Sequence, residues 1–254
     1  MPEQNSKIQD IGKYYDVFSV ETVSEVPETT GLYAWYADLN AGLKDWELEI
    51  IDGIDAGTER LRKLLRRHTE CYSYRELDTK ALGSFSQTWS GQLQDQTADI
   101  LRDVLTKPEK IKNQDNYDFK RAPKLQSTLE SRNARSLMVK ALETAIPILS
   151  APIYVGVAEC LQTRVSQHVK ELTKLADTVV KDPSSRQRLR GVKKTNFALR
   201  TIAAGFAPEN LQVWTFNLEL LIDDIGSTNQ DPRAVSEAIE WVLNRWHRPY
   251  LGRR

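Results

Sequence analysis

Apolar side chains alternate with other residues in several stretches of this chain, and such alternation is typical of β-strands. Three stretches, at 31–37, 152–157 and 211–218, are short and rich in aromatic or β-branched residues, so we predict a strand at each. An earlier stretch at 14–26 alternates less regularly and ends at Pro27, so it predicts either a further strand or an extended arm. The three clear strands therefore come from widely separated parts of the chain.

The stretch after the second strand has apolar residues at three- and four-residue steps, which is the spacing of an amphipathic helix. We predict this helix from Leu161 to Leu175, with Arg164 and His168 four residues apart on it. Residues at that spacing lie one turn apart on the same face. A strand carrying Tyr154-Val155-Gly156, followed by this helix, is a candidate anion site, although ordinary packing explains the same pattern.

The C-terminal stretch predicts one more amphipathic helix. Asp231 and Pro232 form its start signal, because Asp is a good N-cap and Pro is favoured at the first helical position. Apolar residues then recur at helical spacing up to Trp246, and Arg248-Pro249 ends the pattern. Glu240 lies within this helix.

The long block between the first two strands has a different character, with helical spacing and no compelling chemical motif. The predicted helices cover about residues 50–65, where Gly53 and Gly57 interrupt the pattern, 89–105 and 125–149, with a polar loop at 110–124. We therefore predict one domain built from residues 1–40 and 151–254, and a mostly helical insertion at 41–150.

Composition limits the class of protein. With 254 residues and 40% hydrophobic content, the chain can bury the core of one large domain or two small ones. Two distant cysteines, Cys71 and Cys160, form neither a disulfide framework nor a zinc site. The polar N-terminus does not read as a signal peptide, and no stretch approaches the roughly 20 apolar residues that span a bilayer. We therefore expect a cytoplasmic protein with no membrane partner.

The charge balance is zero overall but uneven locally. The chain has 35 basic and 35 acidic residues, which argues against a protein that binds polyanions over its whole surface. Residues 160–200, however, contain ten Lys or Arg and only three acids. The candidate nucleic-acid-binding residues of this stretch are Arg186, Arg188, Arg190, Lys193, Lys194 and Arg200. The alternative is a solvated helix face.

Four elements, taken in order, resemble the GIY-YIG nuclease superfamily. Gly31-Leu32-Tyr33 stands where that family has its first tripeptide, and Tyr154-Val155-Gly156 stands where it has the second. Arg164 and His168 match the family's helix pattern of an arginine followed by a histidine or tyrosine. Glu240, followed by basic residues, matches the helix with the family's metal-binding glutamate. The long gap between the tripeptides departs from the family pattern.

The resemblance implies a role for each matching residue. Glu240 would hold one Mg²⁺ or Mn²⁺ ion, and Arg164 would bind the scissile phosphate. Tyr33 would orient or deprotonate the attacking water, which requires a pKa well below the usual value of about 10. Tyr154 and His168 would complete the hydrogen-bond network, with His168 as a proton relay.

Each of these residues also has an ordinary explanation. Tyr33 and Tyr154 fit half-buried strand aromatics, Arg164 a solvated helix residue and His168 a packing residue. Glu240 fits a surface acid, and Glu237, one turn earlier, is the alternative carboxylate.

The family commonly has an asparagine three residues after the helix-ending proline. Here that position is Gly252, which leaves a catalytically weakened protein as an alternative.

Taken together, the sequence predicts an α+β protein with a small mixed or antiparallel three-stranded sheet flanked by helices. The function that the resemblance implies is metal-dependent hydrolysis of DNA phosphodiesters, and a restriction or phage-defence setting fits slightly better than others. One alternative is a nuclease-fold protein that binds nucleic acid without cutting it. Another is a protein-interaction module, or a homodimer, that works through the helical insertion.

Overall fold

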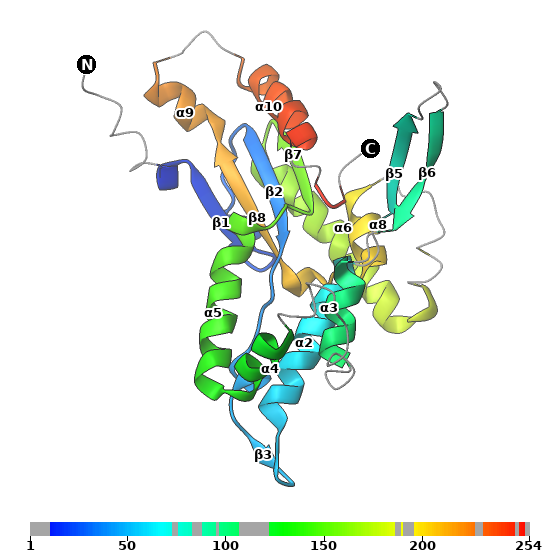
Figure 1. The fold of residues 1–254 in the computed structure, drawn as a ribbon. Coiled ribbons are helices and arrows are strands. Elements are labelled where there is room, and N and C mark those ends of the chain that lie inside the picture. Colours follow the sequence, from blue (N-terminus) through cyan, green and yellow to red (C-terminus); the bar gives the residue numbers. More distant parts are fainter. Residues whose placement is uncertain are drawn as a thin grey trace, which may run out of the picture. The chain divides into compact units, whose positions relative to one another are not determined.

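The protein has an α+β fold that divides into two compact units, and each is described separately (Figure 1). The computed structural model describes residues 11–72, 76–82, 88–94, 97–106, 122–185, 189, 196–226, 231–246 and 249–251. Unit 1 consists of Met1–Asp38 and Ala145–Arg254, and unit 2 of Leu39–Thr144. We predicted the corresponding division at residues 40/41 and 150/151.

Unit 1 contains a four-stranded antiparallel sheet rather than the three-stranded sheet that we predicted. Its strands are β1 (Tyr15–Ser19), β2 (Gly31–Ala37), β7 (Tyr154–Ala158) and β8 (Leu211–Asn217), in the order β1-β8-β2-β7. The predictions for β2, β7 and β8 are confirmed to within two residues at each end. The extra strand comes from the stretch 14–26, whose first part pairs with β8 as an edge strand and whose second part forms the 3₁₀ helix η2 (Val23–Glu25).

Helices follow the sheet strands in unit 1. They are α6 (Leu161–Lys181), α8 (Phe197–Ala204), α9 (Leu218–Asp224) and α10 (Pro232–Trp246), with the 3₁₀ helices η1 (Ile11–Lys13) and η5 (Pro208–Asn210). Local signals explain their ends: the Asn196 and Asn217 side chains cap α8 and α9, and Gly205 ends α8 in the left-handed conformation with φ of 107°. We did not predict α9, because its apolar residues continue directly from those of the strand before it.

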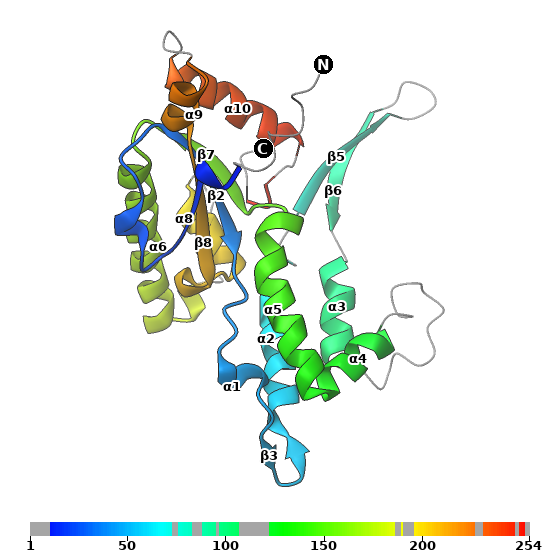
Figure 2. The ribbon, with the colours of Figure 1, turned by 90° about the vertical axis from the view of Figure 1, so that its left-hand side faces the viewer.

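Register decides which side chains of the sheet lie together. Tyr33 on β2 stands opposite Gly156 on β7, and Trp35 stands opposite Tyr154, so all four point to one face. Helices α6 and α8 cover this face, as ring contacts between Tyr33 and His168 and between Trp35 and Phe197 show (Figure 2). The buried stripe of α6 consists of Leu161, Val165, His168, Leu172 and Val179.

Helix α10 begins as predicted, with the Asp231 side chain accepting a hydrogen bond from the Arg233 backbone N–H (3.0 Å). It packs against β7 and β2. After the helix, the Tyr250 and Leu251 N–H groups donate to the carbonyls of Pro152 and Ile153, which ties the C-terminal stretch to the start of β7. No helix in the described ranges is both long and apolar enough to cross a membrane.

Unit 2 is largely helical, as predicted, but it also contains two hairpins that we did not predict. Its elements are α1 (Leu43–Trp46), β3 (Ile50–Ile51), β4 (Ile54–Asp55), α2 (Ala56–Tyr72), β5 (Glu76–Leu82), β6 (Thr88–Gln94), α3 (Thr97–Thr106), α4 (Ala122–Glu130) and α5 (Arg132–Leu149), the last of which continues into unit 1. The predicted helix at 89–105 is wrong in its first half, which is β6, and confirmed in its second half, which is α3. The predicted helix at 50–65 begins instead as a hairpin, whose turn residues Asp52 and Gly53 both have positive φ (51° and 79°).

Candidate functional site

The candidate site is centred on Tyr33, whose ring lies directly over Gly156 of the neighbouring strand. A Cβ atom placed on Gly156 would lie 2.6 Å from the Tyr33 hydroxyl oxygen and 2.7 Å from its Cζ, much closer than van der Waals contact. Glycine is therefore needed here to make room for the tyrosine ring, and not for a special backbone conformation. Tyr33 of the first tripeptide therefore requires a glycine at position 156 of the second tripeptide.

Helix α6 brings His168 to the same point. The Tyr33 hydroxyl and His168 Nε2 are 2.9 Å apart, a hydrogen-bond distance, and the two residues are only 2% and 3% exposed. Tyr154 completes the group, with its ring centre 6.0 Å from both the Tyr33 and the His168 rings. Three segments far apart in the chain thus place two phenols and an imidazole in mutual contact.

Two guanidinium groups flank this cluster. Arg164, one turn before His168 on α6, is half-buried and close enough to the Tyr33 hydroxyl to lower its pKa; its Nη1 also donates to Gln167 (2.9 Å). Arg200 on α8 places its guanidinium carbon 5.7 Å from the centre of the Tyr154 ring. We predicted Arg200 as part of a basic nucleic-acid-binding stretch, whereas the structure places it beside the tyrosines.

Burial keeps the central pair uncharged. Removal from water raises the pKa of Tyr33 above its ordinary value, Tyr154 adds to the increase, and Arg164 offsets it only in part. Burial, with help from the Arg164 and Arg200 charges, lowers the pKa of His168 to about 3. At neutral pH the cluster therefore consists of a neutral phenol, a neutral imidazole and two cations.

The raised pKa of Tyr33 has the opposite direction to the one that a tyrosine base requires. A neutral His168 accepts a hydrogen bond from the Tyr33 hydroxyl through Nε2 when its own hydrogen is on Nδ1. Nδ1 is buried and has no hydrogen-bond partner among the described residues. The pair is thus hydrogen-bonded but incompletely satisfied, which is unusual for buried polar atoms.

Phe197 supports the cluster, although we did not select it from the sequence. Its ring packs 5.5 Å from Trp35, 4.9 Å from Tyr154 and 5.1 Å from His168, measured between ring centres. It is the first residue of α8, directly after the Asn196 cap. A Ser/Thr/Asn/Asp cap followed by an aromatic residue is the one sequence signal that points to it.

Glu240 comes from a different element. It is half-buried on α10, whereas the contacts described above join β2, β7, α6 and α8. The alternative carboxylate, Glu237, is exposed, and its Oε1 accepts a hydrogen bond from Arg233 (2.9 Å). Among the described residues, no group of three or more His, Cys, Asp or Glu is arranged to hold a metal ion. A Mg²⁺ ion held by one carboxylate and by substrate oxygens fits this donor set, and a protein cage does not.

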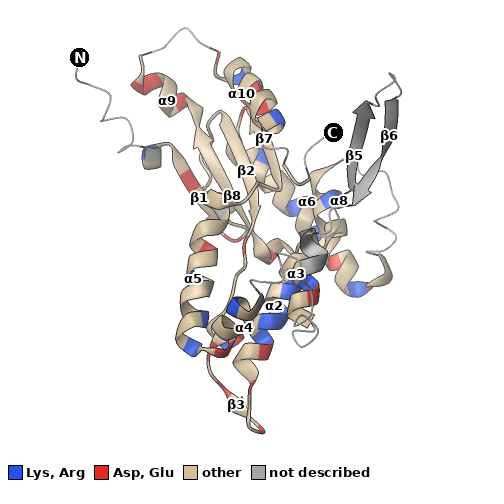
Figure 3. Ribbon diagram, in the orientation of Figure 1, with Lys and Arg blue, Asp and Glu red and all other residues tan. Residues whose placement is uncertain are grey.

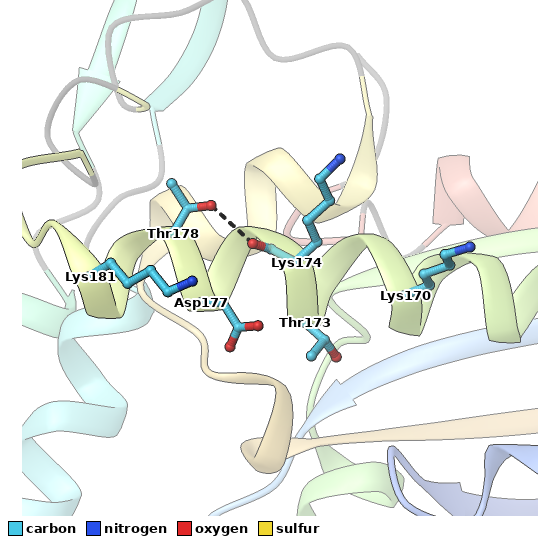
Figure 4. A pocket seen from close by; sticks show the side chains of 6 residues that line it. All are labelled: Lys170, Thr173, Lys174, Asp177, Thr178 and Lys181. Atoms are coloured by element: carbon cyan, nitrogen blue, oxygen red, sulfur yellow. Dashed lines mark hydrogen bonds between the residues drawn. The ribbon is translucent and has the colours of Figure 1, made fainter.

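Most of the predicted nucleic-acid-binding residues lie outside the described part of the chain. These are Arg186, Arg188, Arg190, Lys193 and Lys194, and the same holds for Arg248 and Gly252. The structure instead shows three lysines on the solvent-facing side of α6, namely Lys170, Lys174 and Lys181, beside an open groove of about 530 Å³ (Figure 4). We counted these lysines as part of a basic stretch but did not assign them a role.

The α6 lysines differ from the other basic helix of the protein. Figure 3 shows that Lys and Arg also gather on α2. There, however, Arg60 pairs with Glu49 (2.6 Å), Arg62 with Glu59, and Arg66 with Glu70 (3.5 Å). None of the three α6 lysines forms an ion pair with a described residue. The charge on α6 is therefore available to a ligand, while that on α2 is largely satisfied within the protein.

Comparison with known proteins gives no further assignment. No family model matches the chain, and no match is found among the curated proteins or the solved structures.

Proposed function

We propose that this protein is a metal-dependent endonuclease that hydrolyses DNA phosphodiester bonds at a GIY-YIG-like site. The observation that carries the proposal is the convergence of Tyr33, Tyr154, Arg164 and His168, because the tripeptide and helix patterns predicted that these residues would meet. A restriction or phage-defence setting is part of the proposal on the resemblance alone.

Substrate binding begins with the two arginines. A guanidinium presents a permanent fork of donors that suits phosphate oxygens, and Arg164 reaches the Tyr33 hydroxyl from the partly exposed side of the cluster. A bound phosphodiester brings negative charge next to Arg164 and Arg200. Because these two charges help to lower the pKa of His168, their neutralisation raises that pKa again.

The hydrogen bond between Tyr33 and His168 then provides a path for a proton. The Tyr33 oxygen orients the attacking water and takes its proton, while the Tyr33 proton moves to His168 Nε2 at 2.9 Å. The water oxygen bonds to phosphorus as the bond to the leaving oxygen breaks. Tyr33 remains neutral throughout, so its raised pKa is no obstacle to this route.

Glu240 is the residue that would hold Mg²⁺ or Mn²⁺ in this proposal. When bound, the ion would supply charge stabilisation for the phosphoryl oxygens and the leaving group. Glu240 is preferred over Glu237 because its distance along the chain to Arg248-Pro249 fits the family spacing better.

The test is nicking of supercoiled plasmid DNA with Mg²⁺ or Mn²⁺. We expect Tyr33→Phe and Arg164→Ala each to lower the rate by about 100-fold or more, which is the usual scale of a lost proton-transfer or phosphate-binding group. Tyr36→Phe is the matched control on the same strand, because Tyr36 is half-buried on the opposite face and pairs with Trp214 instead. Equal rates for Tyr33→Phe and Tyr36→Phe would refute the proposal.

Metal binding is tested with Glu240→Ala and Glu237→Ala. We expect loss of cleavage in the first and retention in the second. Cleavage that persists in Glu240→Ala would remove the metal role from this residue while leaving the tyrosine cluster untouched.

A second candidate function is nucleic-acid binding without cleavage. Cleavage requires that the substrate reach Tyr33 and His168, which are only 2% and 3% exposed. This deep burial favours binding without cleavage. DNA binding that weakens with salt, with no nicking under any metal, would select this function. Tight binding to a protein partner, with no DNA affinity at low salt, would instead select an interaction role for unit 2.

A further inference from the structure

The outer face of α10 carries an exposed tryptophan that the proposed chemistry does not use. Trp241 is 59% exposed, although large aromatic side chains usually lose most of their surface on folding. Helix α10 packs through the other side, where Ser236 is buried. Two exposed alanines, Ala234 and Ala238, lie on the same outer face as Trp241.

The guanidinium of Arg245, one turn later, lies over this indole. Its guanidinium carbon lies 3.6 Å from the Trp241 ring centre, and its Nη1 donates to the Trp241 carbonyl (3.1 Å). Arg245 forms no ion pair with a carboxylate in the described ranges, unlike Arg233 on the same helix, which pairs with Glu159 and Glu237. The guanidinium is therefore fixed in place while its remaining N–H groups stay available.

We propose that the Trp241–Arg245 pair binds an unpaired nucleotide of a nucleic-acid strand. The base stacks on the indole and guanidinium planes, and the adjacent phosphate accepts hydrogen bonds from Arg245. The composition of the sequence that follows suits this ligand, since residues 245–254 include four arginines, one histidine and no acid.

This inference rests on the proposed function for the nature of the ligand, because Trp241 directly follows the proposed metal-binding Glu240. It adds a preference that the tyrosine cluster does not explain. A helix face that stacks single bases favours DNA with a gap, flap or frayed end over fully paired DNA, because paired bases are already stacked on one another.

The test is fluorescence polarisation of the full chain with a 5′-labelled single-stranded oligonucleotide and with the blunt duplex of the same sequence, in EDTA. We expect Trp241→Ala to weaken single-strand binding by about 5- to 150-fold, the range for loss of one base stack, with a smaller effect on the duplex. Arg245→Lys keeps the charge but loses the planar stack, so we expect an intermediate loss. Trp246→Ala is the matched control, because Trp246 is even more exposed (75%) and no guanidinium of a described residue stacks on it.

Two results would overturn the inference. One is single-strand affinity in Trp241→Ala that equals wild type or equals that of Trp246→Ala. The other is a change from dimer to monomer in Trp241→Ala with unchanged DNA affinity, which would make a second copy of the chain the occupant. Because EDTA prevents metal-dependent cleavage, binding through Trp241 can stand even where plasmid nicking fails, and nicking can stand where this binding fails.

Discussion

Each unit of this protein buries a polar cluster, and the two clusters are built differently. In unit 2 the fully buried Arg135 donates from Nε to the Trp46 carbonyl (2.8 Å) and from Nη1 to Asp55 (2.7 Å), Thr58 (2.6 Å) and the Leu129 carbonyl (2.7 Å). In unit 1 the buried His168 is neutral and, among the described residues, has one hydrogen bond, to Tyr33. One cluster keeps its charge by giving Nε and Nη1 four acceptors, although Nη2 has no partner among the described residues, and the other stays buried by giving up its charge.

The difference separates structural polar groups from reactive ones. Arg135 joins α1, β4, α2 and the end of α4, so its partners are all inside the fold. Arg164, by contrast, is only half-buried and lies beside the uncharged Tyr33, with the Glu171 carboxylate as a weaker influence on it. A charge satisfied within the chain stabilises the fold, whereas a charge beside neutral groups is suited to an external anion.

Removing Arg135 should have the largest effect on stability. We expect Arg135→Ala to lower the free energy of unfolding by about 3–5 kcal/mol, because it leaves Asp55 and several acceptors without their donor. Urea denaturation followed by circular dichroism would show this as an earlier transition. The control is Arg132→Ala, since Arg132 pairs with Glu47 at an exposed position and should change stability little. Equal effects of the two substitutions would contradict the structural role of Arg135.

The neutral state of His168 predicts a pH effect in the other unit. Its pKa is about 3 in the folded protein and about 6.5 in the unfolded chain, so between these values only the unfolded state binds the proton. Stability should therefore be complete above pH 6.5 and fall by roughly 1.4 kcal/mol for each pH unit below it. Denaturation of wild type and His168→Gln between pH 7 and 4 isolates this contribution.

Protonation of carboxylates also lowers the stability of the folded protein in acid. The measured quantity is therefore the difference in unfolding free energy between wild type and His168→Gln. His68→Gln serves as the control, because His68 lies on α2 in unit 2. A parallel decline in wild type and His168→Gln would mean that His168 is already charged in the folded protein.

Gly156 tests how tightly the tyrosine cluster is built. The methyl group of Gly156→Ala would lie within 2.7 Å of the Tyr33 hydroxyl and Cζ, so the ring must move and the bond to His168 must break. We expect a loss of about 1–3 kcal/mol in stability, typical of overpacking, together with slower nicking. In a Tyr33→Ala background the same substitution should cost much less, which a double-mutant cycle would measure. Equal costs in both backgrounds would argue against this contact.

Much of unit 1 was predictable from sequence, because its signals are local. Alternation identified β2, β7 and β8, and the four-residue spacing of Arg164 and His168 placed them on one helix face. The cluster's support was not predictable, since Phe197 and Arg200 approach Tyr154 only through the packing of α8 on α6. The direction of the Tyr33 pKa also depends on burial, which spacing does not reveal.

Unit 2 was predicted less well, for two physical reasons. Trp89 and Leu93 are four residues apart, which suits a helix, yet the pairing of β6 with β5 decides the conformation instead. The Asp52-Gly53 pair is a strong hairpin signal that helical spacing on both sides obscured. Arg135 gave no signal at all, because an arginine inside an amphipathic helix normally faces water.

The smallest predicted effect concerns charges that lack a partner. Lys170, Lys174 and Lys181 face solvent on α6 without a described ion pair, so their loss should leave folding unchanged. If each contacts one DNA phosphate, changing all three to Gln should reduce the slope of log affinity against log salt by about 2.7. The matched control changes Arg60, Arg62 and Arg66 of α2 to Gln, because those arginines are paired with acids. We expect that control to lower stability more and the salt slope less. The reverse outcome would show that partnering within the chain does not distinguish structural from ligand-binding charges in this protein.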